Sequence, residues 1–114
     1  MPPLRWTALA SLALLALLLA GCGGSDPHQP TYKTIDIKAR AFNPATVEVL
    51  QGDSVQFLNK DTSTHAVRLD SGERETGKIV PGASAAISLP TAGSHRYHCT
   101  IHPTMAGTIV VKEP

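Results

Sequence analysis

Three side chains in one short segment near the carboxyl end of the chain could bind a metal ion. Cys99, His102 and Met105 follow one another at intervals of three residues in the run 97–107, YHCTIHPTMAG. This spacing lets a thiolate, an imidazole and a thioether converge on one ion within a single tight loop. Two cysteines or two histidines would instead indicate zinc. A thiolate, an imidazole and a weak axial methionine are donors of a blue-copper electron-transfer site, which also needs a second histidine.

His65 is the candidate for that second histidine. It follows a predicted strand, and a loop of a β-sandwich could place it at the same end of the body as Cys99. The other three histidines, His28, His95 and His98, are not expected to be ligands. His28 lies in a polar segment near the N-terminus, and His98 faces the opposite side of an extended strand from Cys99.

A lone thiol has other roles that the sequence leaves open. Cys99 could be a small buried hydrophobe, or a nucleophile assisted by His102 or His65 in an enzyme. We do not expect an enzyme, because no orienting third group or oxyanion loop is visible and a small sandwich has little room for a substrate cleft. Two further alternatives are a copper-binding module that stores, delivers or senses the ion, and a zinc-loaded or metal-free adhesion-type sandwich.

The segments that must position these side chains alternate apolar and polar residues with a period of two, which is typical of half-buried strands. No stretch of the body keeps a helical period over three turns. Turn-forming residues separate the strands, and Asp53, Asn59 and Asp61 are interpreted as part of these turns. We therefore predict an all-β fold, a Greek-key sandwich or barrel of seven or eight strands. The polar segment 70–78, DSGERETGK, is predicted to be a solvated loop.

The first 21 of the 114 residues have the form of an export signal, with Arg5 followed by an apolar run from position 6 to position 21. A permanent membrane helix is the alternative, but a span needs about 20 apolar residues. The run ends in Leu19-Ala20-Gly21-Cys22, which resembles the lipobox of bacterial lipoproteins. We therefore expect a signal peptide over 1–21, a lipidated Cys22 with a flexible tether over 22–30, and a single domain over 31–114.

The net charge of the chain after the leader argues against a nucleic-acid partner. Arg5 is one of ten basic residues, so the part of the chain after the leader carries nine basic and nine acidic residues. A neutral body of this kind is not a nucleic-acid-binding surface.

Several landmarks together resemble the cupredoxin family, and within it the amicyanins and plastocyanins. They lie in the same order along the chain from about position 31 to position 113: Phe42-Asn43-Pro44, the Gly52-Asp53 turn, the run 59–67, Gly93 and the run 97–107. The resemblance implies one type 1 copper ion bound by His65, Cys99 and His102, with Met105 as a long axial ligand.

The resemblance also implies a one-electron carrier that cycles between Cu(II) and Cu(I) and is not an enzyme. Its partners would be a redox donor and acceptor met transiently, and the protein would be a monomer. The lipobox-like motif implies a lipid anchor to a membrane, in the periplasm or elsewhere outside the cytoplasm. Two departures stand out. Ala66 occupies a position where the family often has an asparagine that ties the two ligand loops together, and no acidic cluster resembles the plastocyanin docking surface.

Overall fold

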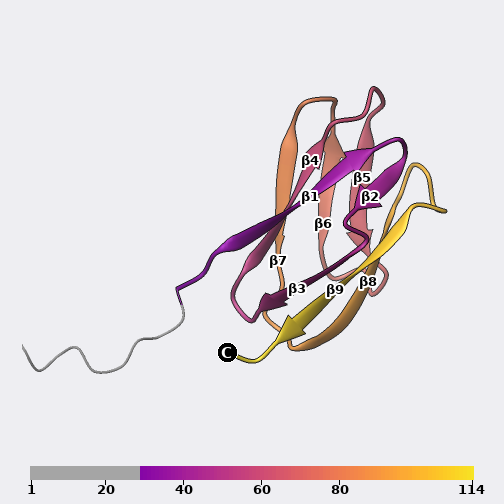
Figure 1. Ribbon diagram of the computed structural model, residues 1–114. Helices are drawn as coiled ribbons and strands as arrows, with labels where there is room; N and C mark the ends of the chain where they lie inside the picture. The colour runs from indigo at the N-terminus through magenta and orange to yellow at the C-terminus, as the bar shows by residue number, and fades with distance from the viewer. Residues whose placement is uncertain (1–28) are drawn as a thin grey trace, which may run out of the picture.

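The computed structural model describes residues 29–114, and these fold as two β-sheets packed face to face (Figure 1). The expected signal peptide over 1–21, Cys22 and most of the expected tether lie outside the described residues. None of the described residues belongs to a helix with the length and apolar character that crossing a membrane requires.

The all-β sandwich predicted from the alternating pattern is confirmed, with nine strands among the described residues instead of seven or eight. The nine strands are β1 (Tyr32–Lys38), β2 (Ala41–Asn43), β3 (Thr46–Leu50), β4 (Ser54–Asn59), β5 (His65–Leu69), β6 (Glu75–Ile79), β7 (Ser84–Ser88), β8 (Gly93–Cys99) and β9 (Ala106–Lys112). One sheet has the order β2-β1-β4-β7 and the other β3-β9-β8-β5-β6. Both sheets are mixed, because β1 pairs with β4 and β3 pairs with β9 in parallel.

The prediction of a solvated loop over 70–78 is wrong for its second half. Residues 75–79 form β6, the edge strand of the five-stranded sheet, antiparallel to β5. Only Ile79 of this strand is buried, the pairing with β5 shifts register between Ala66 and Arg68, and Gly77 has a φ of 76°. A bulged and charged edge strand is a common way to block edge-to-edge aggregation, and its sequence resembles a loop for that reason.

The core between the sheets is built around three aromatic rings. Tyr97 on β8 packs edge-on against Phe42 on β2 and Phe57 on β4, with ring centroids 4.8 and 5.2 Å away. Such T-shaped pairs add about 0.5–1.5 kcal/mol each beyond their buried area. Tyr97 and Cys99 are both fully buried, whereas His98 between them is partly exposed, as the strand parity predicts. The aromatic cluster thus fixes the strand that carries the thiol.

Strand ends from both sheets meet at one end of the sandwich, which we call the site end. In the five-stranded sheet, His65 at the start of β5 pairs with Ile79 at the end of β6. Cys99, at the end of β8, pairs with Val67 of β5. The two sheets are joined here because the Asn59 side-chain amide, at the end of β4, donates to the Ile79 carbonyl at 2.8 Å.

A two-residue turn links β1 to β2 at the same end. Lys38 pairs with Ala41, so Ala39 and Arg40 form the whole loop, with φ values of 52° and 56°. Hairpin loops with two positive φ values usually carry Asn-Gly or Asp-Gly. A residue with a Cβ costs about 1–2 kcal/mol in this conformation, so the turn is strained at both positions.

Gly107 on β9 leaves room for the Tyr97 ring. A Cβ at this position would collide with the Tyr97 hydroxyl oxygen and its ring carbon and would lie 2.7 Å from the Ala45 carbonyl oxygen. The Tyr97 hydroxyl is buried without a hydrogen-bond partner among the described residues, and burial raises its pKa, so it stays protonated at neutral pH.

We expect Gly107→Ala to lower the free energy of unfolding by about 1–3 kcal/mol, because the added methyl group overpacks a filled core. Tyr97→Phe should have little effect by itself, since the hydroxyl that it removes makes no hydrogen bond. In the double variant, Tyr97→Phe should recover part of the loss, which denaturant unfolding of all four proteins measures. Strict additivity of the two changes would contradict this account.

Candidate metal centre

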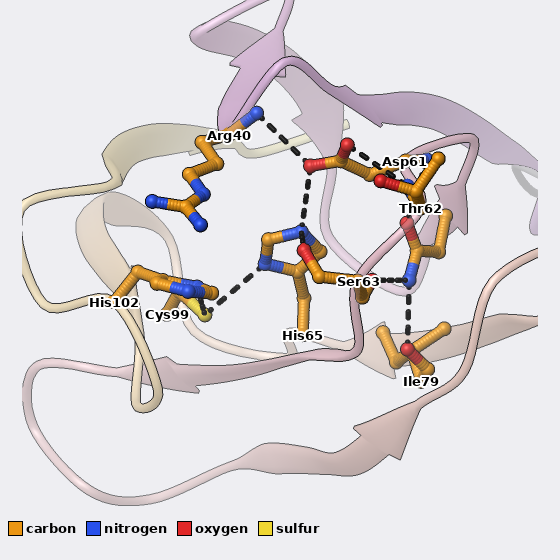
Figure 2. A network of polar contacts seen from close by, with 9 residues as sticks. Arg40, Asp61, Thr62, Ser63, His65, Ile79, Cys99 and His102 are labelled. Carbon is orange, nitrogen blue, oxygen red and sulfur yellow. Dashed lines mark hydrogen bonds and ion pairs between the residues drawn. The ribbon is translucent and has the colours of Figure 1, made fainter.

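Three donor atoms from two distant parts of the sequence converge at the site end (Figure 2). The Sγ atom of Cys99 lies 3.6 Å from Nδ1 of His65 and 3.9 Å from Nδ1 of His102. A ligand atom from each of the three residues lies within 4.8 Å of the others. Within residues 29–114 this is the one group of histidine, cysteine and acidic side chains arranged to hold a metal ion.

The spacing fits a shared ion of the first transition series. Metal–nitrogen and metal–sulfur bonds of about 2.0 and 2.3 Å that meet at trigonal or tetrahedral angles place the two donor atoms about 3.5–3.8 Å apart. The distance from Cys99 Sγ to His65, 3.6 Å, falls within that range, and the distance to His102, 3.9 Å, lies just above it. One thiolate with two imidazoles is a donor set that copper favours, and a methionine at longer range completes a blue-copper centre.

Backbone hydrogen bonds fix the loop that carries Cys99 and His102. The Cys99 N–H donates to the Met105 carbonyl at 3.0 Å, and the Met105 N–H donates to the His102 carbonyl at 2.9 Å. These two bonds close the short turn between β8 and β9. His102 is therefore folded back toward Cys99, and Met105 lies buried at the end of the same turn.

A main-chain bond also ties this loop to the strand that carries His65. The Thr100 N–H donates to the carbonyl of Ala66 at 2.9 Å. Ala66 has no polar side chain for the contact that an asparagine could make. Because the main chain connects the two ligand segments, they stay joined although Ala66 stands where the family often has asparagine.

His65 and His102 differ in their access to solvent. His65 is fully buried, as is Cys99, and Met105 is almost so. His102 is partly exposed, and its ring centroid lies 5.1 Å from that of His65. The candidate site is therefore closed toward the core and approached from the His102 side.

Asp61 orients the buried imidazole. Its Oδ2 atom lies 2.9 Å from Nε2 of His65, so Nε2 carries the proton and Nδ1 is left free to face Cys99. The carboxylate also accepts hydrogen bonds from the backbone N–H groups of Arg40 and Thr62, at 3.0 and 2.9 Å. The hydrogen bond from His65 is the main reason that the pKa of Asp61 lies below its ordinary value of 3.8, and these backbone N–H groups lower it further.

Asn59 holds the short loop between Asp61 and the core. Its side-chain amide is fully buried and donates to the carbonyls of Ser63 and Ile79, both at 2.8 Å. Its carbonyl oxygen accepts from the Asp61 N–H at 2.9 Å. Because all of these polar groups are satisfied in a buried position, the loop is rigid.

The structure brings together three of the four residues predicted to bind metal, and places Met105 on the same turn. His95 and His98 point elsewhere, since they bond to the Thr91 carbonyl at 2.9 Å and to the Asp70 carboxylate at 2.7 Å. Asp53 acts in its turn as predicted, accepting hydrogen bonds from the backbone N–H groups of Thr31 and Leu50. Sequence reasoning treated Asp61 only as a turn residue and missed its bond to His65. An acidic residue four positions before a ligand histidine is the signal that could have identified it.

Comparison with known proteins gives consistent results. The family profile described as Cupredoxin-like domain matches residues 9–111. The chain is 29% identical over 83 residues to amicyanin of Paracoccus denitrificans, covering 68% of this chain and 63% of that protein, which is less than two thirds of its length. It is 28% identical over an alignment of 122 positions to plastocyanin of Prochlorothrix hollandica, covering 95% of this chain and 93% of that one. Among solved structures, the Cu(I) form of a point mutant of amicyanin superposes with a TM-score of 0.63 at 27% identity, covering 69% of this chain and 80% of that one.

The lowered pKa of Asp61 predicts how the metal-free protein responds to acid. A carboxyl group with a lower pKa in the folded state adds stability at all pH values above its unfolded value of 3.8, and loses that contribution as the pH falls through the folded value. Asp61→Asn should therefore be less stable than the parent protein at pH 6, and the difference should shrink below pH 4. Urea midpoints between pH 2 and pH 7 measure this, with Glu73→Gln as a control for net charge. A difference that stays constant over the whole range would contradict it.

Proposed function

The chain belongs to the cupredoxin-like domain family, and on that premise we propose that it is a one-electron carrier with a single type 1 copper ion. The residues that would hold the ion are His65, Cys99, His102 and, as a weaker fourth donor, Met105. When bound, copper supplies a Cu(II)/Cu(I) couple that passes one electron without making or breaking a bond in a substrate. The observation that carries the proposal is the convergence of one sulfur and two imidazole nitrogens within 4.8 Å.

The protein contributes a fixed set of donors. His65 is held by Asp61, and Cys99 lies at the end of a strand packed in the core. Both are anchored in regular or fully hydrogen-bonded structure, so their positions need not change when the charge on the site changes. Small rearrangement on electron transfer is what a rapid carrier needs.

The partly exposed His102 is the natural route for electrons. The other two donor residues and Met105 are buried, so a partner comes nearest to the ion at the His102 ring. Ile101, next to it, is 44% exposed and gives this part of the surface an apolar character. A small, partly apolar contact of this kind suits a short-lived encounter with a donor or acceptor protein. We propose that the carrier acts as a monomer.

Electron relay is favoured over copper storage or delivery by the burial of the donors. A delivery protein has to hand its ion to a partner, which requires most ligands to be reachable. Here His65, Cys99 and Met105 are between 0% and 5% exposed. Buried donors of this kind would hold the ion firmly, and the partly exposed His102 would be the route for an electron.

The proposal extends to the location of the protein. The LAGC motif at 19–22, at the end of an apolar run, supports a signal peptide over 1–21 that is removed and a lipid on Cys22. Residues 22–30 would tether the domain over 31–114 to a membrane outside the cytoplasm. Several acyl chains on one cysteine give durable anchoring, since each buried methylene adds about 0.8 kcal/mol.

We expect the protein loaded with Cu(II) to show intense visible absorption from charge transfer between the Cys99 thiolate and the ion. Cys99→Ser should abolish this band, and His65→Ala should weaken or shift it. His98→Ala is the matched control, because His98 adjoins Cys99 but bonds to Asp70 on the outer face. Circular dichroism confirms that each variant is folded. A folded parent protein with bound copper and no such band would refute the type 1 assignment.

For the anchor, we expect Cys22→Ser to move the protein from the membrane fraction to the soluble fraction of a bacterial host, or to leave the signal segment uncleaved. Mass spectrometry of the parent protein should show a diacylglyceryl-modified N-terminal cysteine. Cys99→Ser serves as the control and should remain in the membrane fraction. Unmodified Cys22 in a fully exported parent protein would overturn this part of the proposal.

A further inference from the structure

The side chain of Arg40 is unexplained by the turn in which it lies. Ala39 and Arg40 both adopt a left-handed conformation in which glycine or asparagine is favoured. The turn contacts the metal centre through the Arg40 N–H, which donates to Asp61 Oδ2 at 3.0 Å. That bond uses only the main chain, so any residue other than proline could make it. The geometry of the turn therefore gives no reason for an arginine.

The guanidinium group extends from this turn toward the metal centre. Figure 2 shows the Arg40 side chain pointing to the side on which the His65 and His102 imidazoles lie. Arg40 is exposed, and it forms no ion pair among residues 29–114. By contrast, Lys60 at the same end is paired with Asp36 at 3.0 Å. The charge of Arg40 thus faces solvent at the site end, and the backbone of this residue is linked to His65 through Asp61.

Other charges at the site end reinforce that of Arg40. Four basic residues lie there, against two acidic residues. The basic residues are Lys38, Arg40, Lys60 and Lys78, and the acidic ones are Asp36 and Asp61. Asp36 is neutralised by Lys60, and Asp61 is occupied by His65 and by backbone N–H groups. The site end is therefore positively charged although the body as a whole is neutral.

We infer that Arg40 is the charged anchor of the docking surface, and that the redox partner presents a carboxylate group to it. The inference deepens the proposed electron-carrier function. A guanidinium group binds a carboxylate through two parallel hydrogen bonds, which fixes orientation as well as proximity. Together with the exposed Ile101 beside His102, it forms a surface with an apolar centre and a cationic rim. A partner with an exposed apolar patch bordered by acidic residues fits this surface.

The anion site can be tested in the absence of copper with hexacyanochromate(III), a paramagnetic trianion. Amide signals of the metal-free protein should broaden first around positions 39–41 and 101–102. Arg40→Asn should remove this broadening, and it should preserve the turn, which favours asparagine. Lys33→Gln removes one positive charge at the opposite end of β1 and should leave the broadening in place. Broadening that is centred elsewhere, or that survives Arg40→Asn, would overturn the inference.

The docking role is tested on the copper-loaded protein. One electron passes from the reduced protein to hexacyanoferrate(III), giving the oxidised protein and hexacyanoferrate(II). At low ionic strength we expect Arg40→Asn to slow this reaction roughly five- to tenfold and Lys33→Gln to change it little, because the attraction to a trianion falls with distance and with salt. Arg40→Lys should restore most of the rate. The cationic oxidant tris(phenanthroline)cobalt(III) should react no more slowly with Arg40→Asn than with the parent protein.

These measurements separate the two proposals. A protein with no thiolate-to-copper absorption would refute the electron-carrier function, whereas the hexacyanochromate map would still decide whether Arg40 binds anions. The reduction potential of each variant is measured alongside the rates. Equal rates for Arg40→Asn and the parent protein with hexacyanoferrate(III), at equal potential, would refute the docking role of Arg40 and leave the carrier function standing.

Discussion

The structure depends on keeping three electron-rich donor atoms together at one buried end of a sandwich. The Cys99 sulfur lies within 3.9 Å of two imidazole nitrogens, both of which present Nδ1 to it. A fully buried imidazole is stable only if its other nitrogen has a partner, and Asp61 supplies that partner for His65. Asp61 in turn is fixed by two backbone N–H groups, from Arg40 and Thr62. The orientation of the donors is thus determined by hydrogen bonds outside the ligand set itself.

The donor atoms can meet because each sheet contributes different residues to the site. The five-stranded sheet carries His65 and Cys99 on β5 and β8, two strands that are hydrogen-bonded neighbours. The four-stranded sheet contributes Asn59, whose buried amide reaches across to Ile79, and it contributes the β1–β2 turn that holds Asp61. A site built in this way requires that the sheets keep a fixed position relative to each other, and the aromatic contacts of Tyr97 with Phe42 and Phe57 maintain it.

The fold class and the run of Cys99, His102 and Met105 could be predicted from the sequence because both depend on local spacing. His65 lies 34 residues before Cys99 and could be proposed only from its place after a predicted strand. Cys99, His102 and Met105 belong to one turn, and the period-two alternation gives strand faces directly. Asp61 could not be assigned in the same way, because its role depends on how the loop before β5 curves. Strand β6 was missed because four of its five residues are not buried, so no apolar alternation marks it. The turn at Ala39 and Arg40 has no turn-forming residues at all, and only the pairing of Lys38 with Ala41 reveals it.

The two histidines of the metal centre are held in different ways, one from the core and one at the surface. His65 is locked from the core side, while His102 is held by a turn of main-chain hydrogen bonds and keeps one edge toward solvent. Asp61 connects the two sides, since one carboxylate oxygen bonds both to the buried His65 and to the backbone of the exposed Arg40. A substitution in the β1–β2 turn that moves this backbone would therefore disturb the orientation of the buried His65 as well as the surface. A change limited to the Arg40 side chain would alter the surface alone. Arg40 in the strained turn therefore has two roles. Its backbone N–H supports His65 through Asp61, and its side chain carries the charge of the proposed docking surface.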